Sequence, residues 1–586
     1  MYLEKINSPE DLKKLSADEM KDLSAEIREV LLKKLSEHGG HVGPNLGMVE
    51  MTVALHHVFN SPKDKIVYDV SHQSYIHKML TGRKEAFINA EKYDEVSGYS
   101  NPEESEHDFF NIGHTSTSIS LASGLAKARD LKSEKDNVIA IIGDGSLSGG
   151  EAYEGLNNAS EAGTNMIVIV NDNDMSIAEN HGGLYKNLRE LRDTEGKSQN
   201  NFFKALGFDY YYVKDGHDFE QLIRVFNRVK DTDHPVVIHI HTIKGKGFEL
   251  AEKNKEQWHY GMPFVLETGA SKFSMGSGED YGNLTAEYLL DAMKKDPKVV
   301  AITSATPTVF GFNSARRKEA GKQFVDVGIA EEHAVALASG IAANGGRPVY
   351  GVYSTFLQRT YDQLSQDLCI NSNPAVILVN YASVYGMNDV THIGLYDIGM
   401  MSNIPNMVYL APTCKEEYFA MLNWGMSQNE HPVAIRVPAL GVIERGTADN
   451  TDYSKLNKYE VTKAGKDVAI VALGDFYQLG EAVINKLSKE NGVEATLINP
   501  KYITGVDEEL LESLKKEHKL VVTLEDGILE GGFGEKVARY YGPSEMKVLN
   551  YGIKKEFLDR YVPDKLMKKN RLTDVQIVED VINIIK

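Results

Sequence analysis

Two short polar stretches, each directly after an apolar run, hold the residues best suited to chemistry. Asp144 stands in a Gly-Asp-Gly sequence after the run at 138–142, and Asn173 follows the run at 166–170. The 29 residues from Asp144 to Asn173 leave room for one helix and one strand, so both side chains can lie at the carboxyl ends of neighbouring parallel strands. A carboxylate, an amide oxygen and a backbone carbonyl, here that of Met175, suit Mg²⁺, which keeps phosphate oxygens among its other ligands. The pair therefore predicts a metal–diphosphate site.

The glycines around Asp144 allow a second interpretation. Gly143 and Gly145 let the backbone approach a ligand closely, and a helix predicted to begin a few residues later presents free N–H groups to phosphate. The same stretch is an imperfect dinucleotide fingerprint, in which Ser148 occupies the third glycine position. That interpretation leaves Asp144 unexplained, because a carboxylate repels a pyrophosphate unless a metal intervenes. Either motif alone is more often a turn than a site, but their spacing favours metal–diphosphate binding.

These sites need a scaffold of buried parallel strands. Short runs rich in Val and Ile recur along the chain, each followed by a turn and a helix-like stretch, and this alternation predicts an α/β fold with mainly parallel sheets covered by helices on both faces. The clearest runs lie at 138–142, 166–170, 236–240, 299–303, 375–379, 468–473 and 520–524.

Two polar or glycine-rich stretches interrupt this alternation. They are predicted linkers at 256–280 and 446–460. Three α/β domains are thus expected, at 1–255, 281–445 and 461–586.

Composition narrows the class of protein. The 586 residues have a formal net charge of −20, which disfavours binding to nucleic acid or to an anionic membrane surface. Cys369 and Cys414 are too few for a disulfide scaffold. The start has no signal-peptide pattern, and no run approaches 18 consecutive apolar residues. We expect a cytoplasmic, multidomain protein that acts on small molecules.

The spacing of Asp144 and Asn173 resembles the cofactor motif of thiamine diphosphate enzymes. Two later stretches strengthen the resemblance. Glu331, in Gly-Ile-Ala-Glu-Glu-His-Ala, matches the glutamate that faces the aminopyrimidine, where a carboxylic acid favours the imino tautomer that removes the proton from thiazolium C2. Phe356, in Tyr-Ser-Thr-Phe-Leu-Gln-Arg, matches the aromatic that stacks on this ring. Without the diphosphate motif, Glu331 would be taken for a solvated helix residue and Phe356 for a core residue.

Within that superfamily the chain resembles the 1-deoxy-D-xylulose-5-phosphate synthase family over nearly its whole length. The matching stretches begin at Gly40, Tyr68, Gly113, Lys244 and Asp526. The resemblance implies a transketolase-like fold with diphosphate-binding, pyrimidine-binding and C-terminal domains. It also implies a homodimer with Mg²⁺ that joins pyruvate to D-glyceraldehyde 3-phosphate, releases CO₂ and serves isoprenoid and thiamine biosynthesis.

The same resemblance assigns individual residues. His41 and His259 would flank the reactive carbon and handle protons, and His392 would contact the bound substrate, tasks that suit imidazoles because their ordinary pKa, about 6.5, lies near working pH. His114 would lie near the diphosphate and the donor substrate, and Ile177 would be the apolar prop that bends the cofactor. The remaining expected cofactor contacts are His72, Gly113, Ser116, Gly143, Gly145, Ser146 and Lys246.

The substrate end departs from the family pattern. Tyr353 and Arg359 are expected substrate contacts. In the family pattern, arginines that bind the acceptor phosphate occupy the positions of Tyr381 and Ala439, and an Asp occupies the position of Asn388. Losing two charge-assisted arginine contacts would cost about 3–6 kcal/mol, or about 10²–10⁴ in affinity. A basic cluster could replace them, although a solvated helix face is the favoured interpretation; it comprises Arg316, Arg317, Lys318 and Lys322.

Four hypotheses follow, of which decarboxylative joining of pyruvate to an aldehyde, with an altered acceptor, is preferred. A transketolase that moves a two-carbon ketol unit uses the same domains. A nicotinamide-dependent oxidoreductase would leave Asn173 and Glu331 unexplained, and a non-catalytic binding protein would not need them. The stretch 180–201 is a candidate lid.

Overall fold

The computed structural model describes residues 2–272 and 278–586, and the chain divides into two compact units. The first unit contains the residues before 277 together with Gly328–Ala330, and the second contains the rest. The predicted linker at 256–280 is described except for 273–277, which lie outside the described residues. The three predicted domains and their boundaries stay predictions.

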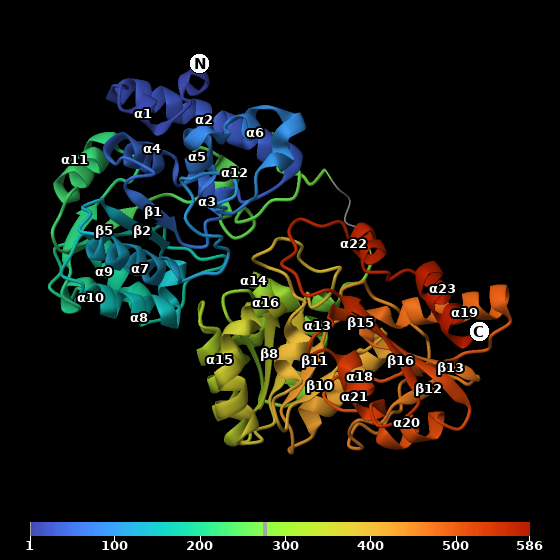
Figure 1. The fold of residues 1–586 in the computed structure, drawn as a ribbon. Helices are drawn as coiled ribbons and strands as arrows, with labels where there is room; N and C mark the ends of the chain where they lie inside the picture. The colour runs from blue at the N-terminus through green and yellow to red at the C-terminus, as the bar shows by residue number, and fades with distance from the viewer. Residues whose placement is uncertain (1, 273–277) are drawn as a thin grey trace. The chain divides into compact units, whose positions relative to one another are not determined.

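The first unit is built on one five-stranded sheet (Figure 1). Its order is β1-β2-β3-β5-β4, and every neighbouring pair is parallel. The strands are β1 (Lys65–Tyr68), β2 (Val138–Gly143), β3 (Met166–Asp172), β4 (Asp209–Val213) and β5 (Pro235–His241). The helices are α1 (Pro9–Leu12), α2 (Ala17–His38), α3 (Gly43–Leu46), α4 (Val49–Val58), α5 (Tyr75–Lys78), α6 (Glu85–Ile88), α7 (Ser118–Leu131), α8 (Gly150–Ala159), α9 (Gly183–Asp193), α10 (Phe202–Ala205), α11 (Phe219–Val229) and α12 (Glu249–Lys253).

Both faces of this sheet are buried because successive side chains of a strand point to opposite faces. In β2, Ile139 and Ile141 pack into one apolar core with residues of α2, α4 and α11. Ala140 and Ile142 pack into the other core with residues of α7, α8 and α9. A sheet covered on both faces has apolar residues at consecutive positions, which is why the sequence of β2 is a continuous apolar run.

The second unit contains two more sheets (Figure 1). One is wholly parallel, in the order β10-β11-β9-β8-β6-β7; the other, β12-β14-β13-β15-β16, is parallel except for the edge strand β12. The strands are β6 (Val299–Thr303), β7 (Phe324–Asp326), β8 (Arg347–Tyr353), β9 (Val376–Asn380), β10 (Val408–Leu410), β11 (Val433–Arg436), β12 (Glu460–Lys463), β13 (Asp467–Ala472), β14 (Thr496–Asn499), β15 (His518–Ile528) and β16 (Lys547–Ile553). The predicted fold class, α/β with mainly parallel sheets, is confirmed.

One apolar core of the second unit joins its two sheets. It contains Ile377 of β9, Val471 of β13 and Val521 of β15. The helices of this unit are α13 (Tyr281–Lys295), α14 (Ser314–Ala320), α15 (Glu331–Ala343), α16 (Ser354–Leu357), α17 (Asp397–Met401), α18 (Lys415–Ser427), α19 (Tyr477–Asn491), α20 (Glu508–Leu514), α21 (Phe533–Tyr541), α22 (Pro563–Lys569) and α23 (Asp574–Ile585).

The candidate lid at 180–201 is largely a packed helix. Within it, α9 buries Tyr185, Leu188 and Leu191 in an apolar core. Arg192, also in α9, donates from its guanidinium to the Asp172 carboxylate at 2.5 Å. These contacts make α9 a part of the scaffold, and the lid stays a prediction.

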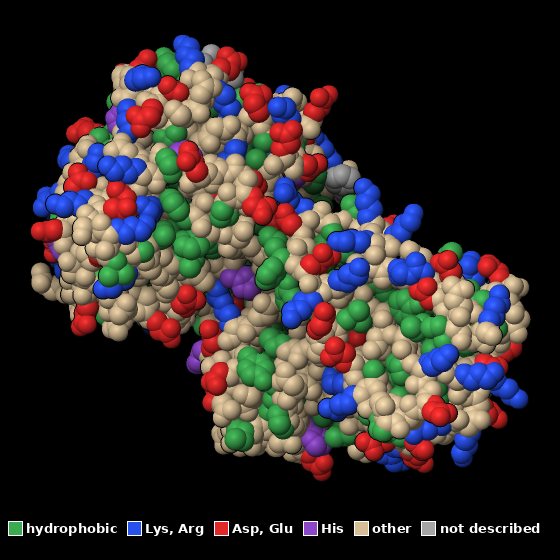
Figure 2. All heavy atoms as spheres, viewed as in Figure 1, with side chains coloured by type: hydrophobic (Ala, Val, Ile, Leu, Met, Phe, Trp, Pro, Cys, Tyr) green, Lys and Arg blue, Asp and Glu red, His purple; other side chains and the backbone are tan. Residues whose placement is uncertain are grey.

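The surface is mixed in charge. Figure 2 shows Lys and Arg side chains interspersed with Asp and Glu side chains on the face in view. Among residues 2–272 and 278–586, no helix has both the length and the apolar content needed to cross a membrane.

A buried histidine pair in the first unit is expected to make the fold sensitive to acid. His56 Nε2 lies 2.9 Å from His77 Nδ1, and His77 Nε2 lies 3.0 Å from an Asp108 carboxylate oxygen that Arg83 also contacts. Burial lowers the pKa of both histidines below its ordinary value. Below about pH 6.5 the unfolded chain therefore binds protons that the folded chain does not, so the free energy of unfolding falls as pH falls, by at most about 1.4 kcal/mol per pH unit for each histidine.

Thermal unfolding between pH 7.5 and 5.5 tests this expectation. The His56→Gln variant keeps a polar partner for His77 but does not titrate, so its Tm should fall less over this pH range than that of the unsubstituted protein. The exposed His333 provides the control, and His333→Gln should leave the pH dependence unchanged. An equal fall in Tm for all three proteins would contradict the assignment.

Candidate active site

Asp144 lies at the carboxyl end of β2, in the first unit. Its backbone N–H donates to Asn171 O at 3.1 Å, and one carboxylate oxygen accepts hydrogen bonds from Met175 N at 3.0 Å and Asn180 Nδ2 at 2.7 Å. The side chain is buried, and burial together with the charge of Asp172 raises the pKa of Asp144 to about 7. Among the described residues no cation forms an ion pair with it. A buried carboxylate in these surroundings is poised to bind a cation.

Asn173 follows the neighbouring strand β3. Because β2 and β3 pair in parallel, with Gly143 beside Asn171, the two polar stretches leave the sheet side by side. Asn173 Oδ1 is buried and has no hydrogen-bond partner among the described residues. A buried amide oxygen without a partner is costly unless a ligand satisfies it. No three His, Cys, Asp or Glu residues in the described ranges are grouped for a metal.

A hydrogen-bonded network of charged side chains lies at the end of β3. Asp172, the last residue of β3, accepts hydrogen bonds from His239 Nε2 at 2.7 Å and from Arg192. Burial alone would raise the pKa of Asp172, but these two hydrogen bonds outweigh it and lower the pKa to about 2. Asp172 is therefore ionised and paired, whereas Asp144 beside it has no such partner.

A serine-rich loop packs against the turn after Asp144. Asp69 accepts hydrogen bonds from Ser116 N at 2.8 Å and Ser118 N at 3.0 Å, which fixes the loop at the start of α7. The Ser116 hydroxyl donates to Ser146 O at 2.8 Å. A Cβ on Gly149 would lie 2.1 Å from Ser116 Oγ, so this position must be glycine for the loop to pack. Of the predicted cofactor contacts, Ser116 and Ser146 are thus brought together at one turn.

Three histidines from distant parts of the first unit form one cluster. The ring centroid of His41 lies 4.8 Å from that of His72 and 5.7 Å from that of His259, and the rings of His72 and His259 are 5.2 Å apart. The Gly40 and Gly261 backbones bond reciprocally at 2.8 Å and hold the two loops together. Burial and the neighbouring cationic groups lower the pKa of His259 well below its ordinary value, so that its imidazole is neutral near pH 7.

Lys244 is a member of this site that the sequence interpretation missed. Its ammonium donates to Ser176 O at 2.5 Å and lies 3.1 Å from His259 Nδ1. Burial lowers the pKa of Lys244 to about 7, and Asp144 partly offsets that shift. The predicted contact Lys246 is half-buried, with its carbonyl bound by Arg28, and Ile177 is also half-buried.

Glu331 begins α15 in the second unit. It is buried, and burial raises its pKa to about 7. Arg359 Nη1 lies 3.7 Å from Glu331 Oε2, which has no hydrogen bond among the described residues. Glu331 is thus a carboxyl group that can hold or release a proton near neutral pH.

A run of aromatic side chains lies in the same unit. Phe356 contacts His392 edge to face at 5.7 Å and Tyr353 at 5.5 Å, and Tyr353 stacks on Tyr381 at 5.1 Å. Burial lowers the pKa of His392 to about 4, and the Thr391 hydroxyl lies 2.8 Å from its Nδ1. The structure therefore brings together four of the residues expected at the pyrimidine and substrate.

Asn388 and Ala439 have roles inside the fold. Asn388 is exposed, and its Nδ2 donates to Tyr561 O at 3.0 Å. This hydrogen bond connects the loop that contains Asn388 to the C-terminal segment. The backbone N–H of Ala439 donates to Asp475 Oδ2 at 3.0 Å. Burial and the charge of Asp526 raise the pKa of Asp475 to about 7.

Arg436, a few residues before Ala439, is enclosed by acids. Its Nε donates to Asp397 Oδ2 at 2.8 Å, and its Nη1 donates to Asp526. All three side chains are buried. Arg436 is therefore fully engaged within the protein.

The basic cluster of α14 is also engaged in part. Arg316 donates to Gly311 O at 2.9 Å and to Glu287 at 2.8 Å, and Arg317 donates to Phe312 O at 3.0 Å. Lys318 and Lys322 are exposed.

Comparison with known proteins decides the family. A family described as 1-deoxy-D-xylulose-5-phosphate synthase matches residues 3–201 and 194–242. A protein of that name from Alkaliphilus oremlandii is 40% identical over 619 aligned residues, covering 99% of this chain and 98% of the relative, and one from Clostridium beijerinckii is 41% identical over 608, covering 97% of each. The chain belongs to the 1-deoxy-D-xylulose-5-phosphate synthase family.

Two further families match residues of the second unit. Families described as transketolase, pyrimidine binding domain, and transketolase, C-terminal domain, match residues 278–440 and 457–577. Among solved structures, a transketolase from Pichia stipitis is 16% identical, with a TM-score of 0.45, over 97% of this chain and 98% of that one. The predicted family is confirmed, and the enzyme is a thiamine diphosphate-dependent transferase. The nicotinamide-dependent and non-catalytic hypotheses are therefore wrong.

Proposed function

We propose that the chain decarboxylates pyruvate and joins the two-carbon unit to an aldehyde, using thiamine diphosphate and Mg²⁺. The observation that carries the proposal is the pair of buried oxygen groups at the ends of β2 and β3: among the described residues, the Asp144 carboxylate has no cationic partner and Asn173 Oδ1 has no hydrogen bond. Both are oxygen ligands of the kind that Mg²⁺ prefers. The donor set therefore fits the metal that the family resemblance implies.

The residues that would hold the cofactor are those around this strand end. Asp144, Asn173 and the carbonyl of Met175 would bind Mg²⁺. The backbone N–H groups at Gly145 and Ser146, together with His72 and His114, would donate hydrogen bonds to the diphosphate. When bound, thiamine diphosphate supplies the electron sink for decarboxylation and for carbon–carbon bond formation.

Glu331 would hydrogen-bond the aminopyrimidine of the cofactor. Burial favours its neutral form, and Arg359 at 3.7 Å favours its charged form, so the carboxyl can donate or accept a proton near pH 7. Phe356 would stack on the same ring. These roles follow from the match between the positions of Glu331 and Phe356 and the motifs of the family.

Neutral imidazoles would move protons at the substrate. Burial lowers the pKa of His259 and of His392, so each can accept a proton from a hydroxyl at working pH and return it. His41, 5.7 Å from His259 between ring centroids, would share this task. Lys244, within hydrogen-bond reach of His259, would orient that ring.

We propose further that the acceptor lacks the phosphate of D-glyceraldehyde 3-phosphate. Tyr381 is neutral, and the backbone at Ala439 is bound by Asp475, which lies beside the buried Asp526. An acidic neighbourhood in which Arg436 is already paired with Asp397 and Asp526 disfavours a phosphate dianion and suits an aldehyde that carries hydroxyl groups.

Release of CO₂ from carboxyl-labelled pyruvate tests both proposals. With thiamine diphosphate and Mg²⁺ present, we expect release to rise more with D-glyceraldehyde than with its 3-phosphate at equal concentration, and KM for the phosphate to be about 10²-fold or more above that for the unphosphorylated aldehyde. Strong stimulation by the phosphate at micromolar concentration would reject the altered acceptor and keep the synthase reaction. No pyruvate turnover in protein that binds the cofactor would favour a transketolase.

The variant Ala439→Arg is expected to lower KM for glyceraldehyde 3-phosphate by about tenfold, because it restores one charge-assisted contact. Release of CO₂ from pyruvate without an acceptor should change little. The control is Leu440→Arg, at an exposed neighbouring position. An equal effect of both variants would show that any added positive charge suffices, and would overturn the role given to position 439.

The remaining family properties are proposed with the activity. We propose a cytoplasmic homodimer whose product serves isoprenoid and thiamine biosynthesis. Light scattering on the purified protein tests the dimer.

A further inference from the structure

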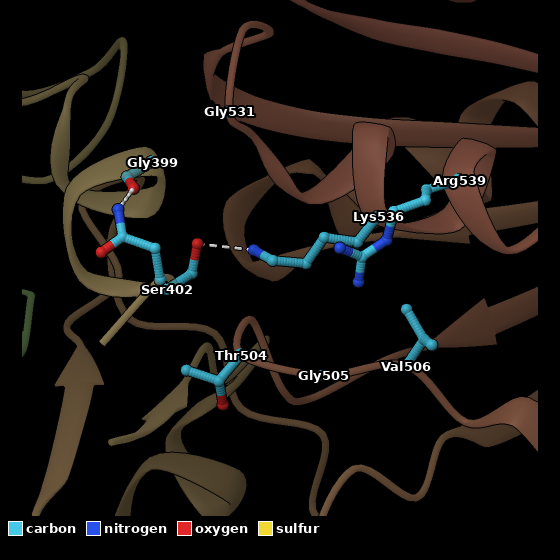
Figure 3. A pocket seen from close by; sticks show the side chains of 9 residues that line it. Gly399, Ser402, Thr504, Gly505, Val506, Gly531, Lys536 and Arg539 are labelled. Carbon is cyan, nitrogen blue, oxygen red and sulfur yellow. Dashed lines mark hydrogen bonds between the residues drawn. The ribbon is translucent and has the colours of Figure 1, made fainter. Parts of the chain in front are cut away.

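A cavity of about 280 Å³ opens in the second unit, and none of its lining residues is a candidate site residue (Figure 3). It lies among α17 and the residues after it, the loop that follows β14, and α21. Its lining residues are Gly399, Ser402, Asn403, Thr504, Gly505, Val506, Gly531, Lys536 and Arg539. A cavity of this size is close to the lower end of the range for small-molecule sites, about 300–1,000 Å³.

Lys536 extends from α21 into this cavity. Figure 3 shows its ammonium directed at Ser402, to whose hydroxyl it donates at 2.5 Å, and it also donates to Ile503 O at 3.3 Å. An ammonium has three N–H donors, so one is left for a ligand. Among the described residues the Glu525 carboxylate forms no ion pair or hydrogen bond with Lys536; it accepts hydrogen bonds from Phe533 N at 2.7 Å and Gly534 N at 2.8 Å.

Arg539 is one helical turn further along α21, so its side chain reaches the same cavity. Its guanidinium forms no hydrogen bond or ion pair with any residue in the described ranges. Five N–H donors in a planar fork are thus available, the arrangement that binds the oxygens of a phosphate in pairs.

The rest of the lining suits the same kind of ligand. None of the nine lining residues is acidic, and the nearest carboxylate on the helix, Glu535, is held by Gly531 N at 2.9 Å. The Ser402 hydroxyl lies beside the Lys536 ammonium, and Thr504, whose hydroxyl accepts a hydrogen bond from Tyr409 N at 3.4 Å, also lines the cavity. In a chain with a net charge of −20, two cations that line one cavity without a lining acid indicate an anion site.

We propose that this cavity binds a phosphate group, either as free phosphate or on a small metabolite, through Lys536 and Arg539. The site is independent of the proposed catalytic function, since it shares no residue with it. Two charge-assisted contacts of this kind give a dissociation constant roughly in the millimolar to sub-millimolar range. A dissociation constant in this range suits a site that senses the concentration of a metabolite.

Chemical labelling of Lys536 tests the proposal at the residue itself. The full-length protein, saturated with thiamine diphosphate and Mg²⁺ so that the candidate diphosphate site is filled, is acetylated with and without inorganic phosphate, and each lysine is followed by mass spectrometry. We expect phosphate to slow acetylation of Lys536 at least about tenfold while the exposed Lys519 is unaffected. Unchanged labelling of Lys536 at saturating phosphate would overturn the proposal.

Calorimetry with inorganic phosphate provides the second measurement. The double variant Lys536→Met/Arg539→Met should bind at least about tenfold more weakly. The control Lys519→Met/Lys547→Met removes two exposed lysines from the same sheet and should bind normally. Equal binding by both double variants would reject the site, because phosphate would then bind only elsewhere on the protein.

Glycerol 3-phosphate distinguishes the two sources of phosphate. If it protects Lys536 as well as inorganic phosphate does, the cavity takes a phosphate monoester; if only inorganic phosphate protects, free phosphate is the ligand. Repeating the labelling without thiamine diphosphate separates this proposal from the catalytic one. Protection should persist even if the protein proves to have another cofactor or no pyruvate turnover.

Discussion

Replacement of Glu331 by Gln is expected to lower kcat about 10²–10⁴-fold, with the affinity for thiamine diphosphate changed less than tenfold. The amide keeps the size of the side chain but cannot give up a proton. Burial raises the pKa of Glu331 to about 7, so the native group is close to the point at which it is best able to exchange one. The measurement is kcat for CO₂ release together with cofactor affinity from quenching of intrinsic fluorescence.

The neighbouring Glu332 is the matched control. It is less buried than Glu331 on the same turn of α15, and Glu332→Gln should retain kcat within about a factor of three. Equal losses in the two variants would mean that a charge on α15, not the proton of Glu331, supports the reaction. A large loss of cofactor affinity in Glu331→Gln with normal kcat at saturation would assign the residue to binding alone.

Replacement of Asp144 by Asn is expected to weaken Mg²⁺-dependent binding of thiamine diphosphate by about 100-fold or more. The uncharged amide also removes a buried carboxylate that has no ion pair among the described residues. The cofactor-free variant should therefore be at least as stable as the unsubstituted protein, because burial raises the pKa of Asp144 and its ionised form opposes folding near pH 7.

These two effects have opposite signs and appear in one experiment. In a thermal unfolding series, Asp144→Asn should show an equal or higher Tm without ligand and no rise in Tm with thiamine diphosphate and Mg²⁺. Asp174→Asn is the control, since Asp174 is exposed in the same stretch and pairs with Arg192. It should retain the ligand-induced rise. A lower Tm for cofactor-free Asp144→Asn would show that Asp144 holds the fold together and would remove the argument for a metal.

The sheet and the strand-end site could be predicted because they depend on local pattern. Continuous apolar runs marked all seven strands that the sequence analysis named, and Asp144 and Asn173 were expected at one edge because parallel neighbours end together. Strands with mixed composition, such as β4 and β12, lacked this pattern, since one is partly exposed and the other is largely so.

The histidine cluster could be found only through the family resemblance. His41, His72 and His259 are distant in the sequence, and the backbone pairing of Gly40 with Gly261 that unites them has no local signal. Lys246, and not Lys244, was predicted as a cofactor contact for a related reason. Gly245 and Gly247 both adopt positive φ values, and only the course of that turn decides which lysine is buried.

The acids around Arg436 were missed because no spacing rule connects them. Asp397, Asp475 and Asp526 come from a helix start, a turn and a long strand, and they meet only through the shared core of the two sheets. The burial of Arg436 between carboxylates was not predictable from the sequence.

The edge strand β12 affects which fragments of the C-terminal sheet stay soluble. It is short, antiparallel to β14 and irregular in register between Val461 and Lys463, and it carries a charge at each end. Such strands discourage the edge-to-edge pairing by which sheets aggregate. A fragment that begins at residue 466 would leave the apolar strand β14, Thr496–Asn499, as an unguarded edge. Fragments of this region should therefore include β12 if they are to stay monomeric and soluble.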